Sequence, residues 1–286
     1  MLRKVLSIVF TLLIVSIVII VILDVNKNSK DEIKKDVNET SYDGFKNTTN
    51  FKMENLDRYI SYKDKNSDMS YEEVVTYVNI GLDYSFYDFV SNANTDLGVL
   101  LLTNKYLKLD SSYEPSDLEE IDGKYFIDGN SNVRLLRKEA KEAFEKLSSD
   151  SILNGTPVYG QSGYRSYRRQ EELFDIAVEN DGYEIAINDT AKPGHSEHQT
   201  GLTIDVSSTK NGNMLEFENT KSFDWMVNNA HKYGFILRYP KDKSHITGFV
   251  YESWHYRYVG IKVATDMHDN YPDLTYEEYF YKYLDK

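Results

Sequence analysis

The sequence predicts an α+β fold. Segments with the periodicity of helices and segments with the periodicity of strands are intermixed along residues 94–286. They do not follow one another in the regular order that a doubly wound parallel sheet requires. A chain of 286 residues is long enough for one substantial domain with additional segments, and we expect that domain over residues 94–286.

The first strong helix pattern is "SNVRLLRKEAKEAFEKLSSD", residues 131–150. Its apolar residues recur at helical spacing and form one stripe, which comprises Val133, Leu136, Ala140, Ala143, Phe144 and Leu147. We expect this stripe to pack in the core.

Strands and helices then follow in irregular order. "TPVYGQSGYRS" predicts a strand that runs into a turn, and "YRRQEELFDIAVEN" predicts a helix. "GLTIDVSS" alternates as a strand does. "SFDWMVNNAHKYGF" predicts a helix that begins after Ser222 and ends at Gly234, and the aromatic-rich "GFVYESWHYRYVG" predicts a strand.

The N-terminal part has a different character. Residues 5–23 are uncharged and apolar over about the length of a membrane-spanning helix, and Arg3 and Lys4 precede them. We expect an uncleaved single-pass anchor with residues 1–4 in the cytoplasm and the rest of the chain outside. A cleaved secretory signal is the alternative, and both readings export the remainder.

Two segments connect this apolar run to the main domain. Residues 24–50 are rich in Asn, Lys, Asp and Thr, so we expect a flexible stalk. Residues 51–93 include "YEEVVTYVNIGLDYSFYDF", whose spacing suits a packed helix. This helical segment either lies beside the domain or begins it.

Composition excludes several classes of protein. The 46 acidic residues outnumber the 33 basic ones and give a net charge of -13, which argues against a nucleic-acid partner. Cysteine is absent from the sequence, so disulfides, thiolate metal ligands and a cysteine nucleophile are excluded.

The chemistry concentrates in "PGHSEHQTGLTIDVSS", residues 193–208, and in "ESWH", residues 252–255. A catalytic zinc site uses three ligands from His, Asp or Glu and leaves a position open for water. His198, Asp205 and His255 supply such a set, and Glu252 is placed to activate the water. His195 could be a fourth ligand, but four protein ligands would close the site, so we interpret it as a loop histidine.

These segments resemble the M15 family of zinc peptidases, in particular the D-alanyl-D-alanine carboxypeptidases of the VanY type (subfamily M15B). The family pattern S-x-H-x-x-G-x-A-x-D is met in "SEHQTGLTID", except that Thr203 stands in place of alanine. The pattern E-x-W-H is met by "ESWH", and "SGYRSYRRQ" supplies a third motif. The resemblance covers roughly residues 95–270 and implies a single domain with a central antiparallel sheet flanked by helices.

The resemblance also implies roles for individual residues. It implies that His198, Asp205 and His255 bind one zinc ion per chain, that Glu252 is the general base, and that Arg165 steadies the developing oxyanion. Four further residues are expected to contact the substrate: Gln170, Ser196, Tyr239 and Arg257. For Arg257, an ion pair that supports the site is an equally good reading.

The implied reaction is removal of the C-terminal D-alanine from peptidoglycan stem peptides. The expected partners are these stem peptides or their lipid-linked precursor, and the expected location is the outer side of a bacterial cell membrane. An L,D-carboxypeptidase acting on tetrapeptide stems would use the same machinery, and a binding module without turnover would use the same fold. A serine enzyme based on "SSTK", residues 207–210, is disfavoured because the companion motifs S-D-N and K-T-G are absent from the sequence.

Overall fold

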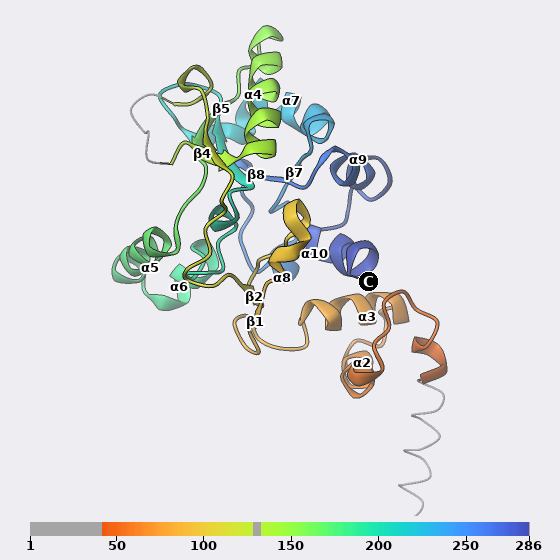
Figure 1. Cartoon of the computed structure of the whole chain (residues 1–286). Coiled ribbons are helices and arrows are strands. Elements are labelled where there is room, and N and C mark those ends of the chain that lie inside the picture. Colours follow the sequence, from red (N-terminus) through yellow and green to blue (C-terminus); the bar gives the residue numbers. More distant parts are fainter. Residues whose placement is uncertain (1–41, 128–132, 286) are drawn as a thin grey trace, which may run out of the picture. The chain divides into compact units, whose positions relative to one another are not determined.

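The computed structural model describes residues 42–127 and 133–285 (Figure 1). The predicted membrane anchor and most of the predicted stalk lie outside these residues. Within the described ranges, every helix is too short or too polar to cross a bilayer. The chain divides into two compact units, one ending at Val78 and one beginning at Asn79, so the predicted boundary at residue 94 falls inside the second unit.

The first unit is helical. A short 3₁₀ turn, η1 (Met53–Asn55), leads into α2 (Leu56–Lys65), and α3 (Tyr71–Ile80) follows. Its small core consists of buried aromatic and valine side chains: Phe45, Tyr59, Val74, Val75 and Val78. The helix predicted within "YEEVVTYVNIGLDYSFYDF" is α3, because "YEEVVTYVNI" places three valines on its inner side.

A four-stranded antiparallel sheet forms the centre of the second unit. Its strands are β5 (Tyr159–Ser162), β6 (Thr203–Ser207), β7 (Phe235–Leu237) and β8 (His255–Tyr258), arranged in the order β5-β6-β8-β7. All neighbouring strands are antiparallel, as expected from the resemblance.

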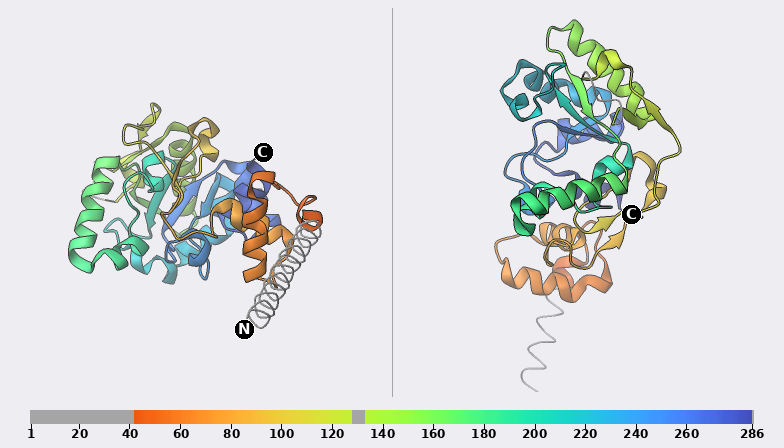
Figure 2. Two further views of the ribbon diagram at one scale, coloured as in Figure 1. Left: turned by 90° about the horizontal axis from the view of Figure 1, so that it is seen from below. Right: turned by 90° about the vertical axis from the view of Figure 1, so that its left-hand side faces the viewer.

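The two faces of the sheet carry different side chains. Ile204 and Tyr256 point to the hydrophobic core, where α4 (Lys138–Leu153) and α7 (Lys221–Asn229) pack against the sheet. Successive side chains of a strand point to opposite faces, so Asp205 and His255 lie on the other face. On that side lie α5 (Tyr167–Asp181) and α6 (Tyr183–Asp189) (Figures 1 and 2).

Short elements complete the second unit. Two small strand pairs are β1 (Ser91–Asn92) with β2 (Leu107–Lys108), which is parallel, and β3 (Leu118–Glu120) with β4 (Leu135–Arg137), which is antiparallel. The remaining helical elements are η2 (Thr95–Leu100), η3 (Gly123–Tyr125), η4 (Glu197–Thr200), η5 (Met214–Asn219), η6 (Ala230–Tyr233), α8 (Ser244–Thr247), α9 (Ile261–Asn270), α10 (Tyr276–Tyr279) and the π-helical turn η7 (Phe280–Leu284).

Three predicted elements differ from the structure at their ends. The helix predicted over residues 131–150 begins only at Lys138, because the preceding Leu135–Arg137 pairs as β4 with β3. The last predicted strand is confined to β8, since the chain before His255 turns to bring Glu252 toward the site. The helix predicted to end at Gly234 forms as α7 followed by η6, and Gly234 ends it with a left-handed backbone conformation at φ 85°.

Candidate active site

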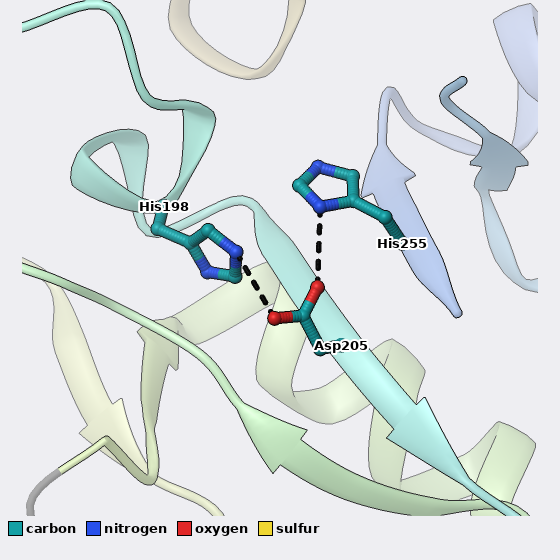
Figure 3. A group of neighbouring side chains, drawn as sticks. All are labelled: His198, Asp205 and His255. Atoms are coloured by element: carbon teal, nitrogen blue, oxygen red, sulfur yellow. Dashed lines mark ion pairs between the residues drawn. The ribbon is translucent and has the colours of Figure 1, made fainter. Parts of the chain in front are cut away.

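Strands β6 and β8 bring two predicted ligands together. Asp205 and His255 are direct register partners in the antiparallel pair, so their side chains lie on the same face. The Oδ1 atom of Asp205 lies 3.1 Å from Nδ1 of His255 (Figure 3). Both residues are only 5% exposed.

The third predicted ligand comes from the turn before β6. His198 lies in η4, which ends at Gly201 with a left-handed φ of 67° that glycine adopts without strain. Its Nε2 lies 3.3 Å from Oδ2 of Asp205 (Figure 3). Its Nδ1 lies 2.7 Å from the carbonyl oxygen of Gly163 and donates to it, which leaves Nε2 with a free lone pair.

These three side chains fit a zinc ion. Ligand atoms from His198, Asp205 and His255 all lie within 4.8 Å of one another. A tetrahedral zinc with bonds of about 2.0 Å holds its ligand atoms about 3.3 Å apart, close to the two separations seen here. Oδ1 of Asp205 is buried and lacks a hydrogen-bond partner among the described residues, as expected of an atom that binds a metal.

At Asp205 and His198 the electrostatics of the site favour the protonation states of metal ligands. Burial raises the pKa of Asp205, but His198 and His255 outweigh it and hold that pKa below its ordinary value. Burial, with the charge of Arg165 added to it, lowers the pKa of His198. Asp205 is therefore anionic and His198 neutral, which are the states in which these side chains bind metals.

Negative charge accumulates around His255. Burial lowers the pKa of His255, but the carboxylates of Asp205, Glu197 and Glu252 outweigh burial and raise that pKa well above its ordinary value. The same group of carboxylates stabilises any other cation placed among them. This charge favours a divalent metal ion in the site.

Glu252 is placed beside the ligands. Its Oε2 lies 3.3 Å from Nδ1 of His255, and its side chain is 14% exposed. Its backbone N–H donates to the carbonyl of Tyr239, which fixes the turn before β8. A carboxylate in this position can exchange a proton with water at the metal.

Arg165 approaches the same point from the turn after β5. Its Nη2 lies 3.9 Å from Oδ2 of Asp205, and its Nη1 donates to Oε1 of Gln170 at 2.9 Å. Gln170 lies in the first turn of α5, which begins after Ser166 because the Ser166 hydroxyl accepts from the N–H of Arg169. The guanidinium is therefore held by a buried amide and aimed toward the ligands.

A cavity of about 270 Å³ joins these groups. All of the predicted site residues except Arg257 line it. Its lining comprises Arg165, Gln170, Leu173, Asp189, Thr190, Ala191, Ser196, Glu197, His198, Asp205, Met214, Tyr239, Phe249, Glu252, Trp254 and His255.

The substrate contact predicted for Arg257 is corrected by the structure. The side chain is 0% exposed, and its Nη1 donates to Oε1 of Glu197 at 2.8 Å. Its other donors are directed to the backbone carbonyls of Tyr258, Val99 and Leu101. Arg257 lies on the same face as His255 but does not line the cavity, so the structure supports the ion pair and not a substrate contact.

His195 lies outside the ligand group. Its Nδ1 lies 2.7 Å from the carbonyl of Asn104, and its ring meets Tyr87 edge to face. Burial lowers the pKa of His195 to about 4, so it is a neutral, satisfied side chain. This agrees with the interpretation of His195 as a loop histidine.

A second group of potential metal ligands has a geometry less suited to binding a metal ion. His231, His268 and Asp269 also lie within 4.8 Å of one another. The two imidazole rings are stacked, with centroids 3.6 Å apart and planes inclined by 17°. The lone pairs of a ring nitrogen lie in the ring plane, so nearly parallel rings do not direct them at one ion.

Sequence reasoning missed a buried charge network that extends from the cavity wall at Glu197. It left Glu197 without a role and did not identify Arg238 or Glu277. These side chains are 0% exposed. The only sequence signal was a glutamate placed between Ser196 and His198 in the predicted metal motif.

Comparison with known proteins gives a consistent answer. Residues 133–261 match the family model described as VanY: D-alanyl-D-alanine carboxypeptidase. YodJ of Bacillus subtilis (strain 168) is 46% identical over 186 residues, which are 64% of this chain and 67% of YodJ. A D-alanyl-D-alanine carboxypeptidase of Enterococcus faecium is 34% identical over 190 residues, which are 64% of this chain and 57% of that protein.

Solved structures show the same relationship. The LdcB LD-carboxypeptidase aligns with a TM-score of 0.63 at 43% identity, over 68% of this chain and 91% of LdcB. A mutant of the vancomycin-resistance D,D-pentapeptidase VanY in complex with Zn(II) aligns with a TM-score of 0.53 at 31% identity, over 64% of this chain and 98% of that one. This chain belongs to the VanY family of D-alanyl-D-alanine carboxypeptidases, within the M15 peptidases.

Proposed function

We propose that this protein is a zinc-dependent D-alanyl-D-alanine carboxypeptidase that removes the C-terminal D-alanine from peptidoglycan stem peptides. The observation that carries the proposal is the convergence of His198, Asp205 and His255 on one point of a cavity that Glu252 also lines. The VanY relative was solved in complex with Zn(II), which supports zinc as the metal, and we assign one ion per chain to these ligands.

Zinc at this site would act as a Lewis acid toward the scissile carbonyl and would lower the pKa of the attacking water. Glu252 takes the proton of that water on its carboxylate and returns it to the nitrogen of the leaving D-alanine. Arg165, held by Gln170, places its guanidinium where negative charge develops on the carbonyl oxygen.

The cavity wall suggests how the substrate is oriented. Ser196 is 5% exposed and lines the cavity beside the ligands, and Gln170 donates through Nε2 to the carbonyl of Ala191 at 2.7 Å. Tyr239 lies over His255 with ring centroids 4.7 Å apart. We assign contacts with the C-terminal end of the substrate to Ser196, Gln170 and Tyr239.

The location of the protein is part of the proposal. The apolar residues 5–23 after Arg3 and Lys4 support a single-pass anchor in a bacterial cell membrane, with the catalytic unit on the extracytoplasmic side. This would place the site near stem peptides or their lipid-linked precursor. The test is to fractionate cells that express the full chain with a C-terminal tag. We expect the chain in the membrane fraction and the tag to be digested by protease added outside the cells. A tag protected from the protease would contradict this location.

Mass spectrometry of muropeptides incubated with the purified protein tests the activity. We expect pentapeptide stems to lose one alanine, and a zinc chelator to abolish the loss. Absence of cleavage by zinc-loaded protein would contradict the proposal and favour a binding module on the same fold.

One observation favours a second candidate function. The LdcB structure, at 43% identity, is that of an LD-carboxypeptidase. Tetrapeptide stems in the same assay distinguish the two activities. Loss of alanine from the tetrapeptide alone would assign the protein to the L,D class.

A further inference from the structure

Four charged side chains are completely buried beside the cavity, and one of them, Glu197, is part of its lining. Glu197, Arg238, Arg257 and Glu277 each have side chains that are 0% exposed. They comprise two positive and two negative charges, so the network is neutral, and losing any single one of them leaves a net buried charge. Buried charges of this kind are tolerated when they are paired and hydrogen-bonded.

The contacts form a chain that leads from the C-terminal helix to the metal ligands. Glu277, in the first turn of α10, receives Nη1 and Nη2 of Arg238 at 2.8 and 2.5 Å in a bidentate pair. The third nitrogen of Arg238, Nε, donates to Oε1 of Glu197 at 2.9 Å. Nη1 of Arg257 reaches the same Oε1 atom at 2.8 Å.

This arrangement fixes the second oxygen of Glu197. With Oε1 held by two arginines, Oε2 faces Nε2 of His255 at 3.7 Å and accepts from the Thr203 hydroxyl at 3.5 Å. Nε2 is the ring atom of His255 that lies away from Asp205, and it lacks a hydrogen-bond partner among the residues described. A carboxylate beside the outer nitrogen of a metal-binding histidine orients the ring and raises its basicity.

We infer that Glu277 is a positioning residue for the metal site. It lies beyond residues 133–261, the part that matches the family model, and it does not line the cavity. The positive charge of Arg238 is divided between Glu277 and Glu197. Without Glu277, Arg238 would neutralise more of the negative charge of Glu197. The Glu197 carboxylate would then interact less strongly with His255. The inference rests on the proposed function, because it treats His255 as a zinc ligand.

Glu277→Gln tests this with little change in shape. We expect zinc affinity, measured by competition with a chromophoric chelator, to fall about ten- to a hundredfold. We also expect kcat/KM at limiting zinc to fall, and excess zinc to restore it. The chelator titration does not depend on turnover, so it reports on the site itself.

A matched control separates positioning from general loosening of the C-terminal helices. Tyr279 of α10 donates its hydroxyl to Oδ2 of Asp266 on α9 at 2.5 Å, away from the charge network. Asp266→Ala breaks this attachment, so we expect it to lower the melting temperature and to keep wild-type zinc affinity.

A folded Glu277→Gln protein with wild-type zinc affinity would overturn the inference. If Glu277→Gln does not fold, Glu277→Asp is measured instead; its shorter carboxylate reaches Arg238 less well, so we expect weaker zinc affinity than in the wild type, and unchanged affinity would overturn the inference. Failure of wild-type protein to bind zinc or cleave stem peptides would instead refute the proposed function.

Discussion

Asp205 and His255 face each other across two paired strands, with Oδ1 of the first 3.1 Å from Nδ1 of the second. Their spacing is therefore set by the backbone hydrogen bonds of the sheet and not by a loop. Of the three ligands only His198 comes from a turn, and the carbonyl of Gly163 fixes its ring. Two of three ligands are thus preorganised by the pairing of β6 with β8.

Removal of His198 should release the metal. His198→Ala leaves two ligands where catalytic zinc uses three, so we expect substoichiometric zinc by elemental analysis of the purified protein. His245→Ala is the control, because His245 is exposed and lies outside the cavity. Full zinc occupancy in His198→Ala would reassign this ligand.

Removal of Glu252 should separate binding from chemistry. Glu252→Ala removes the proposed base but none of the three ligands, so we expect zinc content to remain and kcat to fall by about 10²- to 10⁴-fold. Mass spectrometry of stem-peptide reactions that are quenched at successive times gives the rate. Turnover at the wild-type rate would remove Glu252 from the mechanism.

Removal of Arg165 should act on the transition state. Because its guanidinium is aimed at the developing oxyanion, Arg165→Ala should lower kcat by about a hundred- to a thousandfold. Arg168→Ala is the matched control from the neighbouring helix, since the Arg168 side chain is 88% exposed. Equal rates in the two variants would assign Arg165 a structural role.

A glycine outside the cavity should also control zinc binding. A Cβ on Gly163 would lie 2.4 Å from the carbonyl oxygen of Leu135 and 2.9 Å from that of Val133, and both are backbone atoms. Gly163→Ala must shift the carbonyl that holds His198. We expect zinc affinity about ten- to a hundredfold weaker. Unchanged affinity would show that this hydrogen bond is dispensable.

Lys105 should make stability depend on pH. The side chain is 1% exposed, packs over Phe249 with Nζ 4.0 Å from the ring centroid, and donates to the carbonyl of Ile187. Burial lowers the pKa of Lys105 to about 7, whereas an unfolded lysine titrates near its ordinary 10.5. Between these values the unfolded chain binds the extra proton, so the free energy of unfolding should rise with pH.

Lys105→Met isolates this contribution. Denaturant unfolding at several pH values should give a wild-type stability that rises relative to Lys105→Met between about pH 7 and pH 10. Other groups that titrate in this range cancel in the difference. A constant difference would mean that the carbonyl and the aromatic ring keep the pKa of Lys105 at its ordinary value.

The ligand set could be predicted because local sequence encodes it. His198 and Asp205 occupy a loop and the strand after it, and the E-x-W-H motif marks His255. Whether a side chain is buried or reaches the cavity cannot be read from such local motifs. Strand alternation placed Arg257 on the correct face, but only the folded chain shows Glu197 and three backbone carbonyls covering its guanidinium.

Long-range pairing accounts for the other differences. Leu135–Arg137 has the apolar spacing of the helix that follows, yet it becomes a strand because β3 supplies hydrogen bonds that a single sequence window cannot reveal. Glu277 was missed for the same reason. Its partner, Arg238, is 39 residues away along the chain.

The register of β6 and β8 limits where insertions and deletions can occur in this chain. Asp205 and His255 alternate with Ile204 and Tyr256, which face the opposite side. Inserting or deleting one residue within either strand would turn a ligand into the core and expose an apolar side chain to the cavity. Single-residue insertions and deletions should therefore be tolerated in the connecting loops but should disrupt the site when they fall within these two strands.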